Sequence, residues 1–589
     1  MKSETEFYCN PESYNLLIGL GSQNQIERDH YFKILNRNID SWFLGFGSPN
    51  VNFMENSIDS CSSNNSTLHY LIIQLLPDLL RLSLTAPYED VRENCHNLLL
   101  SLKRKSFRIP RSKFHGPSHF IPFYEIEHCA ILNNENGSNM NEHLYRLLME
   151  HFEEWGRLEN YILIMGFHPV YLEQYLKMYN HLFKGDGSLP YVDRFYLAIM
   201  AAAQMHCKEL IYRFITEFIA AGGDANWLQG LHKAPSRFRA LAVLNQHLCH
   251  QPWQIEPKNI QQLIHSPTGL FHISMSQLMQ AVVIMTHVYS LSSFILVCGI
   301  NSEIDHPPAL VWYSSTNSDS SNSIRNTQSF ENIHLTNSNE VFPNSSFNNN
   351  FANHFQQSET DDDKSDDNHE DCPLAVLMER LRIAQEEDDE LAEDDVAKMF
   401  LSIEKENETI IKNAVHPKEV NPLIERFIED PNFTYVSYNS KNAQILRMQE
   451  YSWSDEACCL ADRFYTDIGK ALEDKFNCSY DLTYNTMGDK VNIDTTLFRL
   501  SVWIYVHSLY GIRHDDFNYA QLDNLLTIPL KTFLKKAMTK PCTSKKSDLF
   551  RFFPEFKISE KVHVALMAAD ARQQACLLHI LKAMQFNNN

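Results

Sequence analysis

Apolar residues recur every three or four positions through most of the chain, with polar residues between them. This spacing places the apolar side chains on one face of an α-helix. It is clearest over residues 68–84, 142–158, 170–184 and 194–224. Alternating positions between hairpin turns, which would predict strands, are scarce. The pattern predicts an all-α protein, with a kink or break at Pro77 and a helix end at Gly222.

The helical pattern is interrupted, and the interruptions divide the chain. From residue 314 to 358, 22 of 45 residues are Asn or Ser, and the acidic run ETDDDKSDDNHED follows directly. This composition buries too little apolar surface to offset the chain entropy of folding. In a chain of 589 residues, several domains are expected. We predict a partly disordered N-terminal extension (1–65), an N-terminal helical subdomain (66–303), a disordered insert (304–372), a charged helical linker (373–428) and a C-terminal helical subdomain (429–589).

The formal charge of −22 is distributed unevenly. Between Glu359 and Asp395 there are 17 acidic and 3 basic residues, a net of −14, which leaves −8 for the remainder. The acidity therefore belongs largely to one segment. A nucleic-acid partner is not expected, because such binding depends on a basic surface.

The stretch from Phe271 to Ser302 contains no formally charged residue, which raises the alternative of a transmembrane helix. Gln, Thr, His and Ser side chains interrupt this stretch, whereas a bilayer span needs about 20 predominantly apolar residues. Buried helices of a helical bundle explain the stretch better, so membrane insertion is not expected.

Thirteen cysteines are scattered along the chain without a C-x-x-C motif or a zinc-ligand spacing. This pattern predicts a reducing compartment and neither a disulfide framework nor a metal or other cofactor. The first ten residues carry no apolar signal region. We expect a cytoplasmic location, with the nucleus as an additional one.

Cys207 is the first candidate for chemistry. On a helix over 194–224 it shares an apolar face with Met200, Ala203, Leu210 and Phe214. A nucleophilic thiolate needs a nearby base, cation or helix N-terminus to lower its pKa, and none of these face residues supplies one. The residues alone favour a buried structural thiol, with catalysis as the alternative.

Two helix starts in the C-terminal subdomain carry charged residues at helical spacing. In DTTLFRLSVW (494–503), Asp494 is a candidate N-cap, and one turn separates Thr495 from Arg499. In SEKVHVALMAADARQQ (559–574), Glu560 and His563 share one face. Taken alone, these residues are ordinary helix starts with solvated charges.

Several long runs together resemble the sestrin family. They include GRLENYILIMGFHPVYLEQYLK, AIMAAAQMHC, AAGGDANWLQGLHKAP, THVYSLSSFILVCGI, VWIYVHSLYGIRHDDF and SEKVHVALMAADARQQACLLH. The resemblance implies two related subdomains of the alkylhydroperoxidase type. It also implies a peroxidase-like thiol at Cys207. Relatives with that chemistry carry a proton relay of Tyr and His, two and seven residues after the cysteine, where this chain has Glu209 and Phe214. Related bacterial peroxidases also carry a second cysteine, at the position of Leu210 in this chain.

For the C-terminal subdomain, the resemblance implies a pocket for a free amino acid such as leucine. Arg499 matches the residue that binds the ligand carboxylate, and Glu560 matches the one that binds its ammonium group. The remaining matches are a threonine-rich lid and pocket wall, namely Thr483, Tyr484, Thr486, Thr495, Phe498, Phe553 and His563. Phe498 and Phe553 replace a leucine and a tryptophan, so the resemblance leaves the identity of the amino acid open.

The resemblance also implies a partner. Asp515 and Asp516, which the sequence suggests to be exposed, match a surface that docks onto the second GATOR complex, an activator of TOR complex 1. Ser274 matches another residue of that docking surface. Two functions follow as hypotheses. The first is an amino-acid-regulated inhibitor of TOR complex 1 that acts in stress and nutrient responses. The alternative is a thiol-dependent hydroperoxide reductase that uses Cys207.

Overall fold

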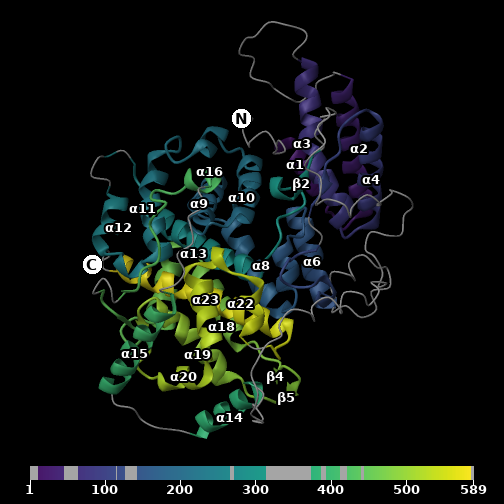
Figure 1. The fold of residues 1–589 in the computed structure, drawn as a ribbon. Coiled ribbons are helices and arrows are strands. Elements are labelled where there is room, and N and C mark those ends of the chain that lie inside the picture. Colours follow the sequence, from purple (N-terminus) through teal and green to yellow (C-terminus); the bar gives the residue numbers. More distant parts are fainter. Residues whose placement is uncertain are drawn as a thin grey trace, which may run out of the picture.

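The computed structural model describes residues 11–44, 64–113, 116–126, 142–265, 269, 271–312, 373–386, 393–411, 421–438, 443–552 and 554–585. Helices dominate this part of the chain, and its strands are two-residue pairs. The prediction of an all-α protein is therefore confirmed. Figure 1 shows a lobe of early helices at one side of a larger body, in which later helices surround two long central ones.

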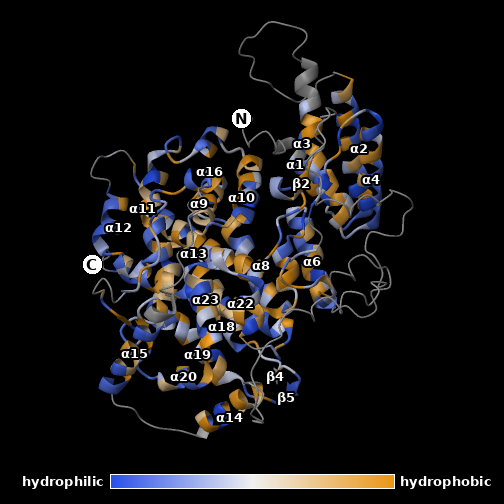
Figure 2. Ribbon diagram, in the orientation of Figure 1, coloured by the Kyte–Doolittle hydropathy of each residue, from blue (hydrophilic) through white to orange (hydrophobic). Residues whose placement is uncertain are grey.

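The early lobe consists of α1 (Pro11–Gly19), α2 (Gln25–Phe43), α3 (Asn64–Thr85) and α4 (Glu89–Arg104). The first two helices lie within the segment that we set apart as an extension. Arg28 of α2 forms an ion pair with Asp90 of α4 at 2.9 Å. Pro77 lies inside α3 without ending it. Figure 2 shows blue, hydrophilic residues along the outer side of α2 and α4, while their apolar residues enter the core.

The N-terminal subdomain contains α6 (Glu142–Trp155), α7 (Asn160–Met165), α8 (Pro169–Phe183), α9 (Tyr191–Gln204), α10 (Lys208–Ala220), α11 (Ser236–His250), α12 (Pro257–Ile264) and α13 (Met275–Val297). The single helix expected over 194–224 is therefore two helices. α9 ends at Gln204, and His206 has a φ of 57°, a left-handed conformation that turns the backbone before α10. The continuous helix was a wrong prediction, because the apolar spacing runs unbroken across this turn.

The C-terminal subdomain contains α17 (Cys458–Phe464), α18 (Ile468–Asp481), α19 (Thr496–Leu509), α20 (Ala520–Leu525), α21 (Ile528–Thr539), α22 (Lys546–Arg551) and α23 (Ile558–Gln585). A short hairpin, β4 (Thr486–Met487) and β5 (Lys490–Val491), precedes α19. A parallel pair joins β3 (Leu446–Arg447) to β6 (Ile512–Arg513). α13 packs along α23 in the centre of the body (Figure 1), and one continuous core includes residues of both subdomains.

The uncharged stretch that raised the transmembrane alternative forms α13. Of the described helices, only α13 is long and apolar enough to cross a membrane. Over its most apolar window, 94% of the helix is buried inside the protein. Its hydroxyl, amide and imidazole side chains, including Gln280, Thr286 and His287, are buried with it. The helix is the core element that the sequence analysis predicted.

The first nine residues of the predicted insert belong to the folded part of the chain. Residues 304–312 pack against the N-terminal subdomain, where β2 (Leu310–Val311) pairs with β1 (Arg111–Ser112). Asp305 is buried and forms ion pairs with Arg81 of α3 at 3.1 Å and with Arg157 at 2.6 Å. Residues 313–372 lie outside the described part of the chain. The predicted linker then contains α14 (Pro373–Glu386), α15 (Glu393–Ile411) and α16 (Pro422–Glu425).

Candidate functional site

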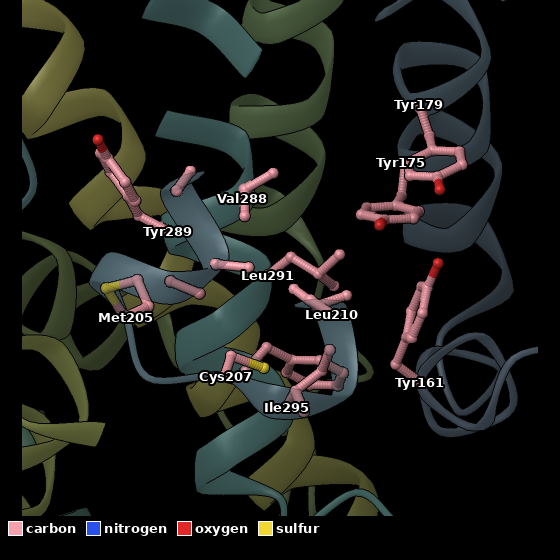
Figure 3. Packing of buried hydrophobic residues seen from close by; sticks show 14 of the residues in the cluster. Tyr161, Tyr175, Tyr179, Met205, Cys207, Leu210, Val288, Tyr289, Leu291 and Ile295 are labelled. Atoms are coloured by element: carbon pink, nitrogen blue, oxygen red, sulfur yellow. The ribbon is translucent and has the colours of Figure 1, made fainter. Parts of the chain in front are cut away.

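Cys207 occupies the N-cap position of α10 rather than the middle of a helix. Its side chain is completely buried, as the sequence analysis predicted. Figure 3 shows the sulfur beside Ile295 of α13, among apolar residues that include Leu210 and Leu291. Leu210, which stands where bacterial relatives carry a second cysteine, therefore lies in the core beside the thiol. The Cys207 side chain has no solvent-exposed surface, because neighbouring side chains cover it.

The electrostatic surroundings of Cys207 oppose thiolate formation. A helix N-terminus ordinarily lowers the pKa of a thiol. Here burial raises the pKa of Cys207 well above its usual value, and the Glu209 carboxylate raises it further. Glu209 Oε2 lies 3.8 Å from the sulfur, and Ser302 donates a hydrogen bond to Oε1 at 3.3 Å. The residue at the relay position is therefore an acid that disfavours the anion, and Phe214 is a buried aromatic.

We predict that Cys207→Ala reduces stability by only about 1 kcal/mol, because it removes one small buried group. Cys207→Ser is expected to cost at least as much, since a buried hydroxyl needs a hydrogen-bond partner. Urea unfolding measures both changes. The natural protein should not consume hydroperoxide with a thiol reductant. Turnover that disappears in Cys207→Ser would contradict the structural role.

Arg499 lies in the first turn of α19, and its guanidinium is held in place by neighbouring oxygens. Nε donates to Thr495 Oγ1 at 3.1 Å, and Nη2 donates to Thr496 Oγ1 at 3.2 Å. Nη1 donates to the carbonyl oxygen of Tyr480 at the end of α18. The expected contact between Thr495 and Arg499 is therefore present. Asp494 accepts from the Thr496 amide at 2.9 Å, although the helix begins one residue later than predicted.

Glu560 lies in the first turn of α23 and connects that helix to the β4–β5 hairpin. Its carboxylate accepts from the Gly488 amide at 2.9 Å and from Thr486 Oγ1 at 3.1 Å. It also accepts from the Lys557 amide at 2.9 Å. Gly488 has a φ of 60°, and a Cβ there would lie 2.7 Å from the Glu555 carbonyl oxygen, so the tight turn requires glycine.

The hairpin spans the distance between the two charged residues. Before β4, Thr483 Oγ1 lies 3.4 Å from Thr495 Oγ1, the same hydroxyl that accepts from Arg499. After Thr483, Thr486 reaches Glu560. The structure therefore links a guanidinium, a carboxylate and four threonine hydroxyls from three separate segments.

His168, which the sequence analysis did not single out, joins this group from the N-terminal subdomain. Its Nε2 donates to the Ser559 carbonyl oxygen at 2.8 Å, so the neutral ring accepts at Nδ1 from Tyr484 Oη at 3.1 Å. Burial lowers the pKa of His168 to about 4, so the ring is neutral near pH 7. The only signal in the sequence was a histidine directly before Pro169 at a helix start.

Two more of the residues that the resemblance assigned to a pocket, His563 and Phe498, lie near this group. Burial lowers the pKa of His563 to about 3, and its Nε2 donates to the Ser479 carbonyl oxygen at 2.8 Å. The ring centroids of His563 and His168 are 5.4 Å apart. Phe498 is buried and meets Phe556 edge-on at 5.9 Å. Phe553 lies outside the described residues.

Of the two aspartates expected at the docking surface, only Asp516 is exposed. The Asp515 side chain is 2% exposed because it accepts from Arg447 at 2.9 Å and from Arg513 at 2.6 Å. Ser274 caps α13 through a reciprocal pair of hydrogen bonds with Gln277, both at 3.1 Å. Asp515 and Ser274 thus have local structural roles.

Among the described residues, no group of three or more His, Cys, Asp or Glu side chains is arranged to bind a metal ion. The polar groups near Arg499 and Glu560 instead suit a small ligand that carries both charges. The fold and this site define a class of all-helical proteins in which a hairpin contacts an arginine network at the start of one helix and a glutamate at the start of another.

Comparison with known proteins identifies the family. A family model described as PA26 p53-induced protein (sestrin) matches residues 116–587. Mouse Sestrin-1 is 34% identical over 81% of this chain and 91% of its own length. Mouse Sestrin-3 is 34% identical over 83% of this chain and 95% of its own length. Human Sestrin-2 is 32% identical over 80% of this chain and 90% of its own length. The chain belongs to the sestrin family, and the matched range begins after α4.

Proposed function

We propose that the chain binds a free amino acid, leucine or a similar one, between Arg499 and Glu560. The observation that carries this proposal is that one hairpin contacts the hydrogen-bond networks of both residues, through Thr483 and Thr486 respectively. A free amino acid carries a carboxylate and an ammonium group on adjacent atoms. A guanidinium matches the first and a carboxylate matches the second. Phe498 supplies an apolar wall for the side chain.

Both charged residues already have protein partners, which a ligand would partly replace. Arg499 Nη1 donates to the Tyr480 carbonyl, and Glu560 accepts from two backbone amides. A ligand carboxylate is a stronger acceptor for the guanidinium than a neutral carbonyl, because charge-assisted hydrogen bonds are the stronger class. Exchange of these partners would couple ligand binding to the position of the hairpin.

We further propose that the amino acid regulates inhibition of TOR complex 1 through the second GATOR complex. α19 connects the proposed amino-acid site to the proposed docking surface. Arg499 lies in the first turn of this helix, and the loop with Asp515 and Asp516 follows the last turn. A ligand shifts such an equilibrium only by its difference in affinity for the two forms. The amino acid must therefore have a higher affinity for the form that has released the partner than for the form that binds it.

Calorimetry of the purified full-length chain against each of the twenty amino acids tests the ligand class. Leucine or another large aliphatic amino acid is expected to give a saturable heat. The absence of binding by all twenty would overturn the proposal. A pull-down of the second GATOR complex with and without the amino acid then tests regulation, and equal recovery would contradict it.

Tyr484→Phe is predicted to weaken amino-acid affinity about twofold to twelvefold, because it removes one hydrogen bond worth about 0.5–1.5 kcal/mol. The lost bond is the one that ties the hairpin segment to His168. Calorimetry of the variant measures the change. Tyr465→Phe is the matched control, since its hydroxyl donates to the His181 carbonyl instead. An equal loss of affinity in both variants would argue against a specific role for Tyr484.

A further inference from the structure

A group of exposed cationic side chains surrounds the hairpin and α22 in an otherwise acidic protein. Between Lys531 and Lys561 there are nine basic and three acidic residues, a net of +6, whereas the whole chain carries −22. Five basic side chains in and beside this stretch are exposed, and none forms an ion pair with any described residue. We call them the basic surface: Lys490, Lys545, Lys546, Arg551 and Lys557.

The hydrogen bonds of Glu560 place two parts of the basic surface side by side. Glu560 accepts from both the Gly488 amide, two residues before Lys490, and the Lys557 amide. Lys546 Nζ lies 5.6 Å from the centroid of the Phe550 ring, which anchors the α22 end of the surface.

The acidic groups nearby leave the surface positive. Asp548 forms an ion pair with Lys536 at 2.5 Å. Burial lowers the pKa of Lys561, and the nearby Glu555 carboxylate opposes that shift. Asp489 is the exposed carboxylate of the hairpin turn. One such carboxylate does not balance five cations, so the surface is suited to an anionic segment.

A segment of the opposite charge precedes α14 in the sequence. Residues 359–371, ETDDDKSDDNHED, hold eight acidic and one basic residue, a net of −7. One residue, Cys372, separates this acidic segment from α14. At the start of α14, Leu374 Cδ2 lies 3.2 Å from the position that a Cβ of Gly488 would take, so α14 begins against the hairpin turn.

We propose that the acidic segment 359–371 binds the basic surface of the same chain. An extended chain covers about 3.4 Å per residue, so Asp366 can reach no farther than about 27 Å from Leu374. Such a short tether raises the effective concentration of the segment to the millimolar range, which favours it over a separate anionic partner. This docking is independent of whether the pocket binds an amino acid.

A carbodiimide that joins carboxylates directly to amines tests the proposal in the full-length chain. Cross-links between residues 359–371 and Lys490, Lys545, Lys546 or Lys557 are expected at 50 mM salt. At 500 mM salt they should fall at least fivefold, because the screening length shortens to a few ångströms. Mixing isotopically light and heavy protein should show that the links form within one chain.

Two variants with equal charge changes complete the test. Replacing Asp361, Asp362, Asp363, Asp366 and Asp367 by Asn should remove the links to the basic surface. The matched control replaces the five acidic residues of the run 386–390 by their amides and should leave those links in place. Links spread over lysines elsewhere, links only between copies, or no links at all would each overturn the proposal.

Discussion

Arg499→Ala is expected to abolish amino-acid binding. The variant leaves the ligand carboxylate in the pocket without a counter-charge, which costs about 2–5 kcal/mol. At 1.4 kcal/mol for each factor of ten, affinity falls roughly 30-fold to more than 1,000-fold. Arg499→Lys should recover only part of the loss, because an ammonium group does not reproduce the planar fork of the guanidinium.

Calorimetry with the best-binding amino acid measures the effect, and Arg463→Ala serves as the control because Arg463 is an exposed arginine of α17. Glu560→Gln tests the opposite side of the pocket. It retains the shape of the side chain but removes the charge that would bind the ligand ammonium group. Thermal unfolding of each variant separates loss of binding from loss of fold. Full-strength binding by both Arg499→Ala and Glu560→Gln would remove the pocket proposal.

The sequence predicted the helical fold and the contacts that lie within one helix turn. Thr495 and Arg499 were expected to meet because four residues separate them, and they do. The turn at His206 was missed because the apolar spacing continues through AAAQMHCKEL, and a single left-handed residue leaves no mark on that pattern. Burial of Cys207 was nevertheless predicted correctly. The residue continues the apolar spacing and faces the core, although it lies at the start of a second helix.

The missed features depend on residues far apart in the chain. His168 reaches Tyr484 across 316 positions, which no local pattern reveals. Asp515 was expected to be exposed because its neighbours are polar, but Arg447, 68 positions earlier, covers it. α1 and α2 were assigned to an extension, although Tyr14 of α1 donates a hydrogen bond to buried Glu217 of α10. In each case, a charged or polar side chain on a distant part of the chain determines where the residue lies.

Lys475 and Asp570 form a buried ion pair within the C-terminal subdomain, and a tyrosine of the N-terminal subdomain contacts it. Lys475 Nζ lies 2.7 Å from Asp570 Oδ1 and 2.7 Å from Gln573 Oε1, which connects α18 to α23. From α8, Tyr171 donates to the same aspartate at 3.3 Å. Burial raises the pKa of Asp570 and lowers that of Lys475, and in each case the partner opposes the shift. Neither charge has access to solvent if the other is removed.

Asp570→Ala is therefore expected to destabilise the protein by about 3–5 kcal/mol, because it leaves the Lys475 ammonium buried without its counter-charge. Replacing both residues, as Lys475→Met with Asp570→Leu, should recover most of that loss, since an apolar pair of similar volume carries no desolvation penalty. Urea unfolding followed by tryptophan fluorescence compares the variants. Lys105→Met is the control, because Lys105 and Asp40 form a partly exposed pair worth at most about 1 kcal/mol. If Asp570→Ala unfolds at the same urea concentration as the Lys105→Met control, the buried pair does not stabilise the fold.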